Sequence, residues 1–130
     1  MSLETGLYTV LTGDAGVSAL VGTRIYPEIM PQGVTYPAIS YQRVSTVRTA
    51  MLSGVDDFTQ VRIVVDCWDD SYSGVKALAA AVKSALDDAR VLGSQAIQHC
   101  MMDGMTDLSQ IEGDREDRHV AIDFIIYLNE

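Results

Sequence analysis

Apolar residues recur at helical spacing near the start of the chain. Leu3, Leu7, Val10 and Leu11 form one stripe, which predicts a short helix that ends near Gly13. Asp14 is placed to cap a second short helix through Leu20 and Val21, and Gly22 suits its left-handed end. The chain therefore opens with a short helical segment.

A longer helix is predicted over residues 71–90. Ser71 or Ser73 can cap its first turn, and the acids at 69–70 suit the positive end of the helix dipole. Gly93 is the expected stop. The apolar face consists of Val75, Leu78, Ala79, Val82, Leu86 and Ala89.

Alternating apolar and polar residues predict strands in most of the remaining chain. The clearest is Phe58–Trp68, where residues 61, 63, 65 and 67 are apolar and face one side. Further strands are expected at 24–29, 38–47, 96–102 and 118–128, with Pro27 confining the first to a sheet edge. A polar segment at 103–116 is expected to lead into the last strand. The run of mixed charge at 112–118 is expected to be a hairpin-like solvated loop, with a docking surface as the alternative.

This order predicts an α+β fold of two layers. We expect a mainly antiparallel sheet of about five strands, a long helix across one face and a short N-terminal helical segment. A length of 130 residues suits one domain, 1–130, with a core large enough to need no metal or disulfide. No apolar run is long enough for a membrane span and no secretion signal is visible, so we expect a cytoplasmic protein.

Charge and motifs exclude several functions. The net charge of −9 and the scattered basic residues argue against nucleic-acid binding by the general surface. No nucleophile elbow or phosphate loop occurs, and the paired aspartates stand where caps and turns are expected, so we expect neither catalytic residues nor a cofactor. A metal site from Cys67, Cys100 and His119 is disfavoured because no C-x-x-C pair is present; buried cysteines are the simpler interpretation.

Two groups of apolar residues are candidates for an assembly interface. Ala50, Met51 and Leu52 fall in an expected loop, where they should either tuck under the chain or contact a partner. Val64 and Trp68 lie on the polar side of the clearest strand. They could contact a neighbouring subunit, or the N-terminal helix could cover them.

Several landmarks resemble the tail-completion (tail-terminator, head–tail joining) proteins of long-tailed bacteriophages. They are the segments A-L-V-G-T-R-I-Y-P at 19–27 and Y-P-A-I-S-Y at 36–41, the strand Q-V-R-I-V-V-D-C-W at 60–68, and the helix that follows a Ser71-Tyr72 turn. The likeness covers about residues 3–90.

The resemblance implies a structural virion protein without enzymatic activity, assembled in the host cytoplasm. It implies a homo-hexameric ring that caps the tail tube, contacts the head connector protein and surrounds a channel through which DNA passes without specific binding. A net negative charge is consistent with such a channel. The alternative is a small-ligand-binding or regulatory α+β domain with a pocket between helix and sheet.

Overall fold

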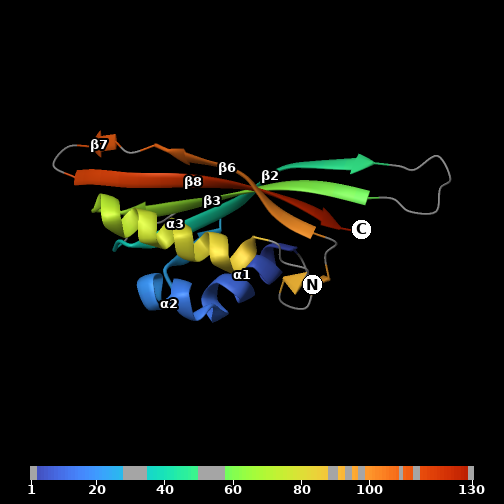
Figure 1. Cartoon of the computed structure of the whole chain (residues 1–130), viewed down its shortest axis with the longest axis horizontal. Helices are drawn as coiled ribbons and strands as arrows, with labels where there is room; N and C mark the ends of the chain where they lie inside the picture. The colour runs from blue at the N-terminus through green and yellow to red at the C-terminus, as the bar shows by residue number, and fades with distance from the viewer. Residues whose placement is uncertain are drawn as a thin grey trace.

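The structure, a computed structural model, describes residues 3–27, 35–49, 58–87, 91–92, 95–96, 99–108, 110–112 and 115–128. Within this part of the chain, helices lie on one side of a mainly antiparallel sheet (Figure 1). The predicted two-layer α+β fold is therefore confirmed.

The main sheet has the strand order β1-β2-β3-β8-β6, and β7 pairs with the first part of β8. Only β1 and β2 run parallel; the other pairings are antiparallel. As expected from Pro27, β1 lies at an edge. The strands are β1 Ile25–Pro27, β2 Ala38–Thr49, β3 Phe58–Asp69, β6 His99–Asp107, β7 Gln110–Glu112 and β8 Arg115–Leu128, and β4 Val91–Leu92 pairs separately with β5 Gln95–Ala96.

The two N-terminal helices are α1, Leu3–Gly13, and α2, Ala15–Val21. The Asp14 carboxylate accepts a hydrogen bond from the N–H of Val17 at 3.0 Å, which caps α2 as the sequence predicts. Gly22 ends α2 with φ of +59°, a backbone conformation that side chains other than glycine rarely adopt.

The third helix, α3, covers Tyr72–Leu86, and Ser71 is its N-cap. The predicted helix continued to residue 90, but Asp87 adopts extended backbone, and its N–H donates to the Lys83 carbonyl at 2.8 Å. The helix therefore ends before the expected stop at Gly93, which lies outside the described residues.

The core fills the space between the helices and one face of the sheet. Val61, Ile63, Val65 and Cys67 on β3 are all 0% exposed, as their alternation predicts. They belong to one cluster with the apolar face of α3 and with buried residues of α1, α2 and β8. We call the face of the sheet toward the helices the inner face, and the opposite one the outer face.

The expected strand bounds are wrong around the polar segment 103–116, which is mostly strand, whereas the hairpin expected near 112–118 is present. β6 extends to Asp107, β7 covers 110–112, and β8 already begins at Arg115. Hydrogen bonding to β8 holds these polar residues in strands, and Leu108 N donates to His119 O at 2.8 Å between β6 and β7. A polar sequence is compatible with this position because these strands form an edge of the sheet.

The expectation that the N-terminal helix covers Val64 and Trp68 is also wrong. All three helices lie on the inner side of the sheet (Figure 1). Leu7 and Leu11 of α1 are fully buried in the same cluster as the inner residues of β3. Apolar residues of α1 and α2 thus extend the core beside α3, and no described helix lies over the outer face.

Candidate assembly surface

The outer face is formed by the second set of alternating side chains on β3 and by their neighbours on β2 and β8. On β3 this set consists of Gln60, Arg62, Val64, Asp66 and Trp68. All five are partly rather than fully exposed, although no described helix lies over them. Their burial comes from contacts within the face, so the geometry of those contacts determines what the surface can offer a partner.

An aromatic cluster occupies one end of the outer face. The ring of Trp68 stacks on His119 with centroids 3.8 Å apart and planes 11° apart, and on Tyr36 with centroids 6.4 Å apart. Trp68 Nε1 donates to Ser40 Oγ at 3.3 Å, and His119 Nε2 lies 2.6 Å from Asp66 Oδ1. These contacts join β2, β3 and β8, so Trp68 has a structural role inside its own chain.

An ion pair crosses the outer face nearer the other edge. Arg62 of β3 donates to Asp103 of β6 at 2.9 Å, across the intervening strand β8. This hydrogen bond to the Asp103 carboxylate raises the pKa of Arg62 above its usual value. The guanidinium therefore stays charged at every pH of interest, and the outer face presents aromatic, aliphatic and charged groups together.

Of the other predicted interface residues, Val64 is partly buried between Gln42 of β2 and Asp123 of β8, its register partners. Ala50, Met51 and Leu52 lie outside the described residues. The structure thus brings Val64 and Trp68 onto one face.

Two exposed valines of β2 are not evident as surface residues from the sequence. Val44 is 52% exposed and Val47 is 55% exposed, and both lie where β2 has no described partner on its second side. Alternating polar and apolar residues continue through this part of the chain and indicate a strand. Alternation does not show whether a strand lies at an edge of the sheet, so the exposure of the two valines could not be predicted from it.

The metal site of Cys67, Cys100 and His119, which the sequence already disfavours, is incompatible with the fold. Cys67 faces the core, whereas His119, next to Val120 in β8, lies on the outer face. Cys67 is opposite Val120 and Cys100 is opposite Ile126, so about 20 Å of strand separates the two thiols, too far for a disulfide. The described residues contain no group of His, Cys, Asp or Glu suited to a metal ion.

Burial also makes both thiols unreactive. It raises the pKa of Cys67 far above its usual value and that of Cys100 to about 12, mainly through desolvation. Among the described helices, none combines the length and apolar character that a membrane span requires.

Comparison with known proteins gives the family of the chain and a structure of the same fold. A family model described as tail completion protein gp17 matches residues 5–129. The chain belongs to this tail completion family. Its role is therefore that of a structural protein of phage tail assembly, as the resemblance implied. A search with this chain finds no match among curated proteins.

A solved structure shares the fold of this tail completion protein. A chain from a structure titled "Virion of native gene transfer agent (GTA) particle" superposes with a TM-score of 0.81 at 20% sequence identity. The match covers 99% of the chain described here and 96% of the chain from that particle. At this identity the match supports the architecture, and the family model carries the assignment.

Proposed function

We propose that this tail completion protein forms a hexameric ring that caps the phage tail tube, joins it to the head connector protein and surrounds the DNA channel. In this role it resides in the virion after assembly in the host cytoplasm. The main support is the family match over residues 5–129. A protein that completes a tail acts through its contacts with other proteins and not through a chemical reaction.

The two-layer architecture supports a role in assembly. All described helices lie on one side of the sheet, which leaves the mixed aromatic, aliphatic and charged outer face without a helix layer. Aromatic residues and arginine, both present on this face, are enriched in protein–protein interfaces. Val64 lies on that face among exposed and half-buried neighbours, so it is accessible to a neighbouring protein.

The charge of the chain is compatible with a channel for DNA. At −9, the protein repels phosphate at a distance, so DNA can pass without being held. A hexamer would carry six times this charge. The passage of DNA through the ring would therefore be insensitive to sequence.

The first experiment is native mass spectrometry over a wide range of protein concentration, with negative-stain imaging of large species, alone and with purified tail tubes. We expect a hexamer with a central hole, located at one end of the tubes when tubes are present. A protein that stays monomeric in solution and fails to bind tube ends would contradict the proposal.

The segment Ala50, Met51 and Leu52 provides a mutational test of the proposed contacts. Replacing Met51 and Leu52 with Asp should prevent assembly and leave the monomer folded, because charges at an apolar contact are costly once buried. Replacing Tyr8 and Thr9 with Asp adds the same charge at exposed positions of α1, away from the segment, and serves as the matched control. Normal assembly of the Met51→Asp, Leu52→Asp variant would remove this segment from the interface.

The alternative, a ligand pocket between helix and sheet, has no support in the described residues. Val75, Leu78 and Val82 of α3 are at most 1% exposed and pack in one cluster with the inner face of the sheet. Apolar side chains fill that space, so the structure favours the assembly role.

A further inference from the structure

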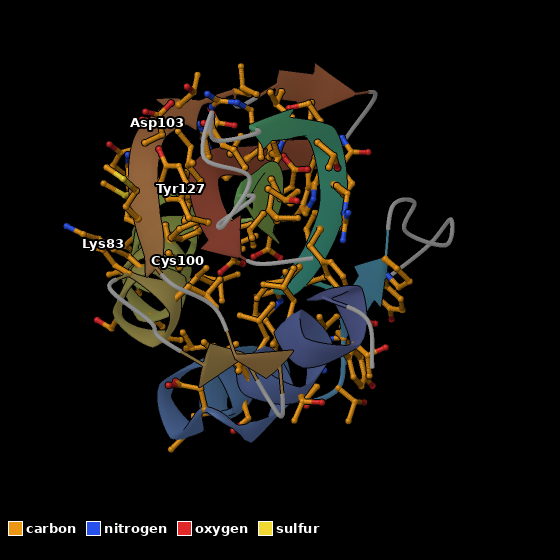
Figure 2. All side chains as sticks on the ribbon, turned by 90° about the vertical axis from the view of Figure 1, so that its right-hand side faces the viewer. Lys83, Cys100, Asp103 and Tyr127 are labelled. Atoms are coloured by element: carbon orange, nitrogen blue, oxygen red, sulfur yellow. The ribbon has the colours of Figure 1, made fainter. Side chains whose placement is uncertain are left out.

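In the described part of the chain the sheet has two open edges, and they differ in charge. β2 is paired with β1 only at residues 39–41, so its second half has no strand partner on that side among the described residues. β6 ends the sheet on the opposite side. Figure 2 shows the two strands at opposite sides of the sheet, with Cys100 and Asp103 on β6 and Tyr127 of β8 between them.

The open half of β2 is exposed, and the strand as a whole is basic. All side chains from Val44 to Val47 are exposed, including two valines. The strand contains two arginines and no acid, and without these two charges the rest of the chain carries −11. A long exposed edge of this kind favours pairing with another strand. Its charge favours an acidic partner, which a second copy of this chain supplies.

The edge of β6 has the complementary character. Residues 99–107 include Asp103 and Asp107 but no lysine or arginine, and Met101 and Met105 are each 38% exposed. The acids contact Arg62 and Lys76 but keep side-chain exposures of 45% and 47%, so a second base can approach them.

Only part of the β6 edge is open. Met102 directs its N–H away from β8 to Asp87 Oδ1 at 3.1 Å, which blocks a neighbouring strand at this position. Farther along, Leu108 N donates to His119 O, so by antiparallel alternation Met105 and Asp107 direct their backbone groups away from β8. The open part of β6 is therefore the end near Asp107.

We propose that the open half of β2 pairs in antiparallel fashion with the β6 edge of a second copy of this chain. The inference rests on the proposed ring, and it assigns the contact between neighbouring subunits. β2 and β6 lie at opposite sides of the sheet and run in opposite directions. When all copies have the same orientation, β2 of one copy is therefore antiparallel to β6 of the next, and the sheet stays antiparallel across the contact. Such a head-to-tail contact generates a ring when its rotation closes.

Backbone alternation indicates the register of this contact. Ile39 N donates to Arg24 O, so the backbone groups of Ile39 point to the β1 side of β2. After the bulge between Arg43 and Ser45, the backbone groups of Thr46 and Arg48 point to that same side. Thr46 opposite Asp107, and Arg48 opposite Met105, would match the outward groups of the two strands. Val47 would then lie opposite Thr106.

The register is compatible with a closed ring. Within one sheet, the register places Val47 opposite Gln60, Gln60 opposite Tyr127, and Tyr127 opposite His99. Thr106 lies opposite Ala121 of β8, which is six residues from Tyr127. The contact between two copies would therefore shift the strands by six positions. Six positions correspond to about 20 Å along the strands, and four strand spacings to about 19 Å across them. The strands would tilt by about 45° from the ring axis, near the values of closed β-barrels.

Disulfide trapping tests the contact directly. Val47→Cys and Thr106→Cys lie on the outer face, and at this register they form a non-hydrogen-bonded pair, where side chains are close. Mixing the two single variants under mild oxidation should give a mixed dimer, and the double variant in one chain should give covalent chains of subunits. The buried native cysteines do not compete.

The matched control combines Val47→Cys with Tyr8→Cys, since Tyr8 is 40% exposed on α1, away from either edge. It should give no mixed dimer above background. A hexamer that forms without the Val47–Thr106 disulfide would overturn the edge contact and leave the proposed ring intact. A protein that shows neither oligomer nor disulfide at any concentration, even on tail tubes, would overturn both.

A proline variant tests the same contact without thiol chemistry. Thr46→Pro removes an N–H that points to the open edge, so the hydrogen bonds between β2 and β3 remain. We expect the concentration for half-assembly to rise by about tenfold or more, because a backbone hydrogen bond is lost at each contact. Thr46→Val keeps the N–H and is the control. Equal assembly by a folded Thr46→Pro variant would overturn the proposal.

Discussion

Gly74 in the first turn of α3 should not tolerate even alanine. A methyl group there would overlap the Asp69 carboxylate and lie 2.6 Å from Ser71 Oγ. These two side chains hold the start of the helix: Ser71 Oγ accepts from Gly74 N at 3.1 Å, and Asp69 Oδ1 accepts from Asp70 N at 2.7 Å. Asp69 is only 8% exposed, so it has little room to move.

The magnitude follows from these contacts. Displacing Ser71 removes a helix cap, at a cost of about 1 kcal/mol. Displacing Asp69 breaks a part-buried hydrogen bond to a carboxylate, at about 1.5–3 kcal/mol. Alanine regains at most about 1 kcal/mol over glycine in helix propensity. Gly74→Ala should therefore lower the free energy of unfolding by about 1.5–3 kcal/mol.

Urea denaturation followed by circular dichroism measures this change. Ser84→Ala, an exposed substitution on the same helix, is the control and should leave stability within about 0.5 kcal/mol. In a Ser71→Ala background the effect of Gly74→Ala should shrink, because the cap is already lost. A Gly74→Ala protein as stable as the parent would refute the steric reasoning.

Two further predictions concern the core. Leu78→Ala, at a 0% exposed position facing the sheet, should cost about 2–5 kcal/mol in urea denaturation, and an unchanged midpoint would contradict its place in the core. Stability should also fall at alkaline pH, because the folded state keeps the Cys100 thiol protonated up to a pKa of about 12 while the unfolded thiol ionises near 9. This contribution is fully present below pH 9 and is lost above it, by about 1.4 kcal/mol per pH unit. Cys100→Ala should flatten the decline in the urea midpoint between pH 9 and 11, whereas an equal decline in both proteins would exclude this cause.

Local chemistry determined much of the fold. The cap of α2 at Asp14 and the positive φ of Gly22 were predicted, and Ser71 was one of the two predicted candidates for the cap of α3, because each depends on residues within one turn. The inner face of β3 was predicted as well, since alternation alone assigns its residues to one side. The family resemblance rested on these same local patterns.

Tertiary structure decided what covers each face and which strands are edges. The sequence cannot show that the stripe with Leu7 and Leu11 packs on the inner side, because an apolar stripe specifies burial but no partner. The strand character of residues 103–116 depends on hydrogen bonds to β8, a distant segment whose pairing overrides local polarity. The same pairing leaves the second half of β2 open, because a strand becomes an edge only through the order in which strands assemble.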